Sequence, residues 1–357
     1  MKFTVSVHDL RDAILNAMPA VTPNATLPAR TAVNIEAVKG RNPVRVTGAG
    51  DEAVIVAGVP NARVSVAGSA MLPPAPLSRW LGTLPPERLL TVETVDTGLR
   101  FSSEESAPYA FRTLTGTFPD DPVPKTNTAS VRFDLLPEAL NRVRKLVPRD
   151  MPMVHIMSKE GALVVDAADR FRLTRVSLPG VGFGSFSANL RLDSADRIAK
   201  ANPKALNWDT RAVRAVGDTV SVTERFLADQ QFPSVETILG ASPDQELTVD
   251  GDIFLTALRR LSSVDPDAAV SITFDADCIV IGLHEASVGA GQEQVPASAD
   301  PSTDFTASVN LRYLTDAVAA HPGVDITIGF TSPRDALFFK SATGTVDTTA
   351  VIMPLNL

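Results

Sequence analysis

The sequence is poor in residues that could tie a fold together covalently or hold a metal ion. Its 357 residues include one cysteine, Cys278, and four histidines, at positions 8, 155, 284 and 321. A single cysteine excludes an internal disulfide framework and any paired-cysteine zinc or redox site. The histidines lack the close spacing of metal ligands. We therefore expect no metal, no cofactor and a fold held by packing alone. Cys278 lies in an alternating apolar segment and is predicted to be a buried thiol.

Long apolar runs and an excess of positive charge are also absent. No segment approaches the roughly 18 consecutive apolar residues of a membrane span, and Met1–Val5 lacks the basic and apolar regions of a signal peptide. A cytoplasmic location is therefore expected. The sequence has 33 lysines and arginines against 41 aspartates and glutamates, a net charge of −8. This balance excludes a globally basic surface that coats nucleic acid, but not a basic patch on one face.

The motifs of common enzyme classes are missing too. The sequence contains no GxxxxGK[ST] phosphate loop, no HExxH and no GxSxG nucleophile elbow. Asp166 and Asp169 could form a carboxylate pair, but they end an apolar strand and precede Arg170. A turn with a local ion pair is the simpler interpretation, and we expect a protein without catalytic activity.

What the sequence does contain is a threefold repeat. Offsets of 126 and 118 residues align Val5 with Val131 and Val249. Downstream of each valine, apolar residues recur at i, i+3, i+4 and i+7, the pattern of an amphipathic helix that follows a strand. These residues are Leu10, Ala13, Ile14 and Ala17 in the first unit, Leu136, Ala139, Leu140 and Val143 in the second, and Phe254, Ala257, Leu258 and Leu261 in the third.

A second amphipathic helix recurs later in each unit, around Leu77, Ala195 and Leu314. Pro85, Pro203 and Pro322 follow it, and proline cannot continue a helix. Alternating β-rich segments fill the gaps, for example 44–59, 163–176 and 270–283. We predict an α+β fold of three domains, at residues 1–122, 128–239 and 245–357, each with two helices packed on antiparallel sheets. Residues 286–304 are rich in small and polar side chains and are predicted to form a long loop.

The predicted helices carry positive charge on the face opposite their apolar stripes. Acidic residues fall mainly in the first turns, where the helix dipole favours them, and basic residues in later turns. An ordinary solvent-exposed face explains such charges, but the arrangement also suits helices that present cations to phosphates. The candidate DNA-facing residues are Arg11, Arg79, Arg142, Arg144, Lys145, Arg197, Lys200, Lys204, Arg259 and Arg260.

Seven segments, in order along the chain, resemble those of bacterial DNA sliding clamps, the β subunit family of DNA polymerase III. They are MKFTVSVHDLRDAI at the start, ATLPARTAVNIEA at 25–37, TFPDDP at 117–122, DAADRFRLTRVSLP at 166–179, QFPSVETIL at 231–239, VNLRYLTDAV at 309–318, and VIMPLNL at the C-terminus. The resemblance implies a homodimer closed into a six-domain ring, whose helices surround duplex DNA and contact phosphates without reading sequence. It implies a processivity factor that tethers the replicative polymerase and other DNA-processing proteins.

The resemblance also implies a hydrophobic pocket between the second and third domains for short peptides of the polymerase, the clamp loader and repair proteins. Its residues would be Met151, Met153, Ala168, Arg170, Phe171, Arg172, Leu173, Pro233, Thr237, Ile238, Val351, Met353, Pro354, Leu355 and Leu357. The rim departs from the family. Arg170-Phe171 replaces the usual Gly-His, and Thr237 and Asn356 stand where basic residues are common, so the preferred peptide is open.

Two other interpretations remain. A diverged or virus-encoded ring could keep the peptide pocket and use DNA weakly, and an enzyme could have an active site without a known motif. Retention on closed circular against linear DNA separates the first of these from a sliding clamp, because a ring runs off linear ends.

Overall fold

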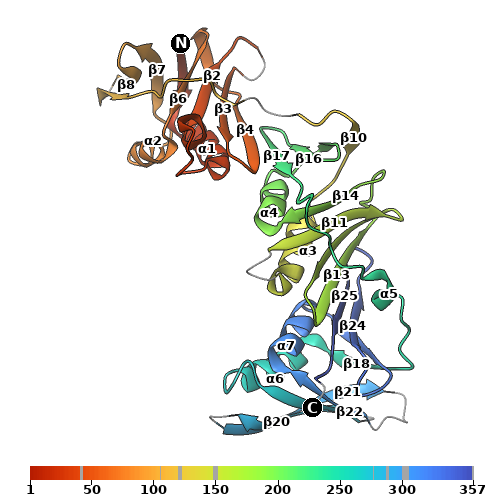
Figure 1. Cartoon of the computed structure of the whole chain (residues 1–357). Helices are drawn as coiled ribbons and strands as arrows, with labels where there is room; N and C mark the ends of the chain where they lie inside the picture. The colour runs from red at the N-terminus through yellow and green to blue at the C-terminus, as the bar shows by residue number, and fades with distance from the viewer. Residues whose placement is uncertain are drawn as a thin grey trace. The chain divides into compact units, whose positions relative to one another are not determined.

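The structure is a computed structural model, and it describes residues 1–40, 43–104, 106–119, 123–147, 152–275, 277–286, 289–299 and 305–355. The chain divides into two compact units (Figure 1). Unit 1 comprises Met1–Arg132 and Arg197–Phe226, and unit 2 comprises Phe133–Asp196 and Leu227–Leu357. Within the described ranges, no helix is long and apolar enough to cross a membrane.

Unit 1 contains two antiparallel sheets. One has the order β5-β1-β7-β8-β9 and the other the order β10-β15-β16-β17-β4-β3-β2-β6. The strands are β1 Lys2–Ser6, β2 Val33–Ala37, β3 Val44–Ala49, β4 Ala53–Val59, β5 Arg63–Val66, β6 Gly68–Leu72, β7 Leu89–Val95, β8 Gly98–Ser103, β9 Ser106–Phe111, β10 Asn127–Ser130, β15 Ala205–Trp208, β16 Ala212–Val216 and β17 Val220–Arg225. The helices are α1 Val7–Ala17 and α2 Pro74–Leu81, with short 3-10 turns η1 Met18–Ala20 and η2 Pro28–Thr31.

Unit 2 is built on one long antiparallel sheet, with the order β14-β11-β12-β13-β25-β24-β23-β18-β21-β20-β19-β22. Its strands are β11 Met153–Lys159, β12 Ala162–Ala168, β13 Arg172–Pro179, β14 Ser187–Arg191, β18 Gln245–Asp250, β19 Ala269–Phe274, β20 Cys278–Ala286, β21 Gly289–Ala299, β22 Phe305–Asn310, β23 Asp325–Phe330, β24 Leu337–Ala342 and β25 Asp347–Ile352. Its helices are α3 Leu136–Val143, η3 Arg144–Leu146, α5 Glu236–Leu239, α6 Gly251–Ser262 and α7 Leu311–Ala319, while α4 Leu192–Lys200 spans the border of the two units.

The predicted helices form where the apolar periodicity places them. Each stripe of the first helix set is buried, from Leu10 in α1 to Leu136 in α3 and Phe254 in α6. Local capping fixes where helices begin, since Ser6 accepts a hydrogen bond from the backbone of Asp9 in α1 and Asp250 does the same at the start of α6. The α+β prediction with paired helices on antiparallel sheets is confirmed.

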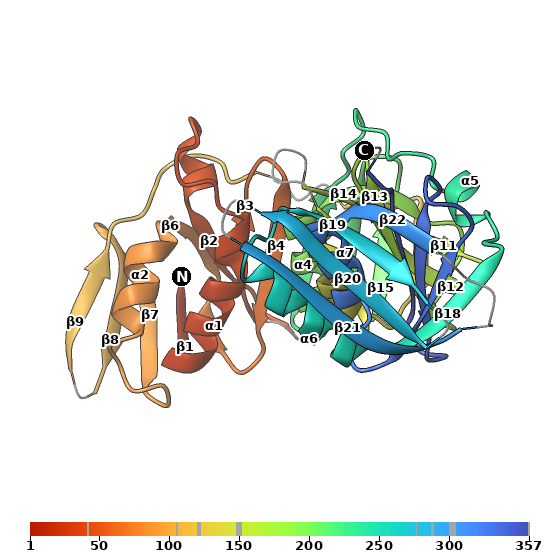
Figure 2. The same ribbon diagram turned by 90° about the horizontal axis from the view of Figure 1, so that it is seen from below.

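Two local predictions were wrong. Residues 289–299 form β21, which pairs with β20 and lies beside it in Figure 2, instead of a long loop. Its inward positions are Gly291, Glu293 and Val295, so the alternation of a strand was hidden by a glycine and a charged residue. Cys278 is only partly buried, because Ile279 and Ile281 occupy the inward positions of β20.

The same strand contact occurs twice along the repeat. Strands β2-β3-β4, β11-β12-β13 and β19-β20-β21 are three equivalent meanders. The third strand of the first meander, β4, pairs with β17, and the third strand of the second, β13, pairs with β25. Strands β17 and β25 are the last strands of the second and third predicted domains. Because these sheets cross the predicted domain borders, the borders themselves stay a prediction.

Candidate partner pocket and cation-bearing helices

Most of the predicted pocket residues lie around one cavity of about 70 Å³ in unit 2. They are Ala168, Arg170, Phe171, Arg172, Leu173, Pro233, Ile238, Val351 and Met353. Asp169, Ser234 and Val235 also line the cavity and were missed. Met153, Thr237, Pro354 and Leu355 do not line it, and Met151 and Leu357 lie outside the described residues.

The cavity has an apolar floor and an apolar exposed rim. Leu173 on β13, Val235 before α5 and Val351 on β25 are buried and pack together. Phe171 is 53% exposed, and Ile238 and Met353 are exposed as well. Exposed large apolar side chains around a concave site are the usual means of anchoring a short peptide.

The turn between β12 and β13 is held by Asp169. One carboxylate oxygen accepts hydrogen bonds from the backbone N–H groups of Phe171 and Arg172, at 2.9 and 3.1 Å. The other accepts from Nε of Arg172 at 3.0 Å. The predicted turn with a local ion pair is thus confirmed for Asp169, and its partner is Arg172 instead of the adjacent Arg170.

Arg172 is fully engaged behind the rim. Its Nη1 donates to Asp316 at 2.7 Å, and its guanidinium lies 4.3 Å from the ring centre of Tyr313. Burial by itself lowers the pKa of Arg172, but the hydrogen bonds to Asp316 and Asp169 raise it overall. Phe171 stacks on the other partner of this arrangement, with 6.3 Å between its ring centre and that of Tyr313. The Tyr313 side chain was not among the predicted residues.

A polar hollow of about 400 Å³ adjoins the cavity and shares Pro233, Ser234 and Val235 with it. Arg175 donates to Asp166 at 2.8 and 2.7 Å and to Glu236 at 2.7 Å, and Lys159 donates to Glu236 at 2.9 Å. These hydrogen bonds from Arg175 and Lys159 lower the pKa of Glu236 to about 2. The network therefore ties α5 to the sheet and leaves its charges balanced.

Two of the candidate DNA-facing cations are engaged inside the protein. Arg142 is 8% exposed and donates to Oγ1 of Thr348 at 2.8 Å and to Glu138 at 2.6 Å. Arg197 donates through Nε and Nη2 to Glu224, at 2.5 and 3.0 Å, and Glu224 has no exposed surface. The expectation that Arg142 lies on an exposed helix face was wrong, because its guanidinium is drawn onto β25.

Four other candidates are exposed but have a carboxylate partner. Arg144 pairs with Asp196, Lys204 with Asp218 and Arg260 with Glu293, and Lys145 lies 3.7 Å from Asp316. The remaining four are Arg11 on α1, Arg79 on α2, Lys200 on α4 and Arg259 on α6. All four are exposed, and within the described ranges no carboxylate pairs with them.

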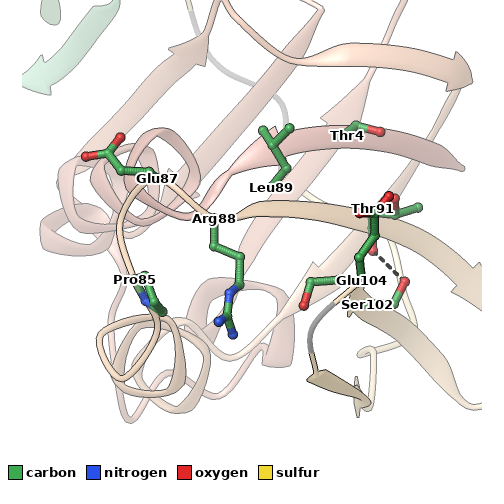
Figure 3. A pocket seen from close by; sticks show the side chains of 9 residues that line it. Thr4, Pro85, Glu87, Arg88, Leu89, Thr91, Ser102 and Glu104 are labelled. Atoms are coloured by element: carbon green, nitrogen blue, oxygen red, sulfur yellow. Dashed lines mark hydrogen bonds between the residues drawn. The ribbon is translucent and has the colours of Figure 1, made fainter.

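Unit 1 has further hollows that hold few of the predicted residues. One of about 740 Å³ lies on the outer side of β1, β7 and β8, where Arg88, Leu89 and Glu104 extend from different segments (Figure 3). Another, of about 250 Å³ between α1 and α2, includes Arg11. Among the residues that the structure describes, no group of three or more histidine, cysteine or acidic side chains could hold a metal ion.

Comparisons with known proteins agree with this architecture. Residues 236–356 match the family model described as DNA polymerase III beta subunit, C-terminal domain. The chain is similar over 100% of its length, and of theirs, to the DNA polymerase III subunit beta from Pseudomonas aeruginosa (TM-score 0.89, 18% identity) and to pol III beta of Caulobacter crescentus (0.87, 18%). It is also similar to the DNA polymerase sliding clamp from Bacillus subtilis (0.86, 19%), with 100% of this chain and 99% of that one covered.

Proposed function

Because the chain belongs, through residues 236–356, to the DNA polymerase III β subunit family and has the sliding-clamp fold throughout, we propose that it is a sliding clamp. In this function it is a non-catalytic processivity factor, which encircles duplex DNA in the cytoplasm and tethers a polymerase to it. The three domains predicted at 1–122, 128–239 and 245–357 are the units of that ring.

The observation that carries the proposal is the repeated junction between strands. The pairs β4–β17 and β13–β25 join the third strand of one meander to the last strand of the next repeat. The remaining members of the set are β21 and β9. In the described part of the chain, β9 pairs only with β8, and β21 pairs with β18 only through Ala297–Ala299. By the same rule, β9 of one copy pairs with β21 of a second copy, which closes two chains head to tail.

The exposed cations supply the contact with DNA. Arg11, Arg79, Lys200 and Arg259 lie on helices of all three repeats, in a chain whose net charge is −8. A few phosphate contacts without base contacts hold DNA weakly and without sequence preference. Such contacts suit a protein that must slide.

The cavity around Phe171, Ile238 and Met353 is the docking site for hydrophobic peptides of the polymerase and the clamp loader. Replacing Met353 with Ser would place a polar group among its apolar anchors and weaken peptide binding. A protein-interaction ring that uses DNA weakly is the second candidate, because six of the ten predicted cations are engaged with carboxylates of the same chain.

Size-exclusion chromatography with light scattering tests ring closure. We expect a particle of about twice 37.9 kDa, and substitution of Tyr109 on β9 with Pro should shift it to the single-chain mass, because proline removes a strand N–H group. The matched substitution of Thr128 with Pro on β10, a strand not assigned to the junction, should leave the dimer intact. A single-chain mass for the unaltered protein at micromolar concentration contradicts the two-chain ring.

A further inference from the structure

Three arginines lie around the two hollows of unit 2, and their charges are compensated to different degrees. Arg172 is bonded to Asp169 and Asp316, and Arg175 is bonded to Asp166 and Glu236. Arg170 is exposed on the rim of the apolar cavity, and no carboxylate in the described ranges pairs with it.

The turn geometry explains why its neighbour Asp169 does not neutralise Arg170. Both carboxylate oxygens of Asp169 accept hydrogen bonds from within the turn, from the backbone of Phe171 and from the backbone and side chain of Arg172. The same bonds hold the β12–β13 turn in a fixed shape. Arg170 therefore projects a positive charge from a rigid segment beside Phe171, and the exposed side chains of Ile238 and Met353 complete the apolar surface there.

We propose that the pocket selects hydrophobic peptides that carry an aspartate or glutamate next to their apolar anchors, with Arg170 binding the side-chain carboxylate. This inference rests on the proposed function of the cavity as a peptide site and specifies its partner. Charge complementarity favours an acidic side chain, because Arg170 provides a planar guanidinium that can bind a carboxylate through two hydrogen bonds. Asp169 and Asp316 do not repel it strongly, since Arg172 already compensates both.

Fluorescence anisotropy with the full chain tests the proposal. Three labelled peptides contain a Leu-Phe pair: one has Asp before the pair and an amidated end, one has Asn there and an amidated end, and one has Asn and a free C-terminal carboxylate. For the unaltered protein at low salt we expect the Asp peptide to bind about threefold to fivefold more tightly than the amidated Asn peptide, as for an exposed ion pair. The preference should shrink as salt is added.

The arginine variants assign the preference to one residue. Arg170→Gln should remove it, while Arg334→Gln, which removes an exposed arginine of unit 2 outside the cavity, should retain it. Equal binding of the two amidated peptides, both weakened by Met353→Ser, overturns the acidic preference and leaves the peptide pocket in place. Tightest binding of the free-carboxylate peptide overturns the assignment to an acidic side chain. If none of the peptides binds, or Met353→Ser binds as well as the unaltered protein, the pocket and the inference both fail.

Discussion

Arg197 and Lys200 lie one turn apart on helix α4, yet their surroundings differ completely. Arg197 is bonded to the fully buried Glu224, whereas Lys200 is exposed and has no carboxylate partner in the described ranges. Arg142 on α3 and Arg259 on α6 show the same contrast. The comparison indicates that the cations of the repeat form two classes: internal arginines that hold β-strands to helices, and exposed residues that can meet phosphates.

Replacing Arg197 with Ala should give the largest effect. Glu224 would lose both hydrogen bonds to the guanidinium, and breaking an ion pair with a buried member costs about 3 to 5 kcal/mol. Urea unfolding measures this, with Lys200→Ala as the control on the same helix, expected to stay within about 0.5 kcal/mol of the unaltered protein. The double variant Arg197→Met with Glu224→Gln should recover much of the loss. Equal stabilities of Arg197→Ala and Lys200→Ala would abolish the distinction between the two classes.

The pH dependence of stability should reveal the surroundings of Arg142. Burial, with a smaller contribution from Arg142, lowers the pKa of His321 from 6.5 to about 3. Above pH 6.5 both folded and unfolded states are neutral at this residue, so its contribution is intact. Between pH 6.5 and 3 the unfolded chain binds the proton more tightly, and stability falls by about 1.4 kcal/mol per pH unit.

Denaturant unfolding at pH 7, 6, 5 and 4 checks this expectation. His321→Gln should lack the part of the slope due to this residue, while His284→Gln, at an exposed position on β20, should keep it. Identical slopes in His321→Gln and the unaltered protein would contradict a neutral buried imidazole.

Arg142→Ala should destabilise the protein by about 2 kcal/mol, the cost of hydrogen bonds lost from a charged group to Thr348 and Glu138. Its control is Arg144→Ala, which removes an exposed pair with Asp196 worth less than about 1 kcal/mol. Thermal unfolding compares the two variants. A larger loss for Arg144→Ala would place Arg142 in the wrong class.

Removing the four unpaired cations should have the smallest effect on stability and a clear effect on DNA association. Replacing Arg11, Arg79, Lys200 and Arg259 with Gln removes up to four phosphate contacts, and each contributes about 0.9 to the slope of log affinity against log salt. The control replaces four exposed arginines outside the DNA-facing set, Arg45, Arg63, Arg112 and Arg334, with Gln. Equal salt slopes for the two quadruple variants would remove the phosphate role from the exposed class.

The helices and the α+β class could be predicted because apolar residues at helical spacing and terminating prolines are local signals. The two cation classes could not. Arg142 is bonded to Thr348, 206 residues away, and only the packing of α3 on the sheet determines that contact. Strand β21 was missed since Gly291 and Glu293 occupy its inward positions. The pocket segments were found by resemblance, but the roles of Asp169 and Tyr313 depend on how a turn and a helix meet.

Topological retention on DNA tests the central claim most directly. The protein is incubated with linear duplex, the ends are ligated, and the complex is filtered at high salt, which weakens phosphate contacts but does not open a closed ring. The sliding-clamp account predicts that protein stays with the ligated circles and is released when a restriction enzyme cuts them. Equal loss of protein from circles and from unligated linear DNA would contradict it.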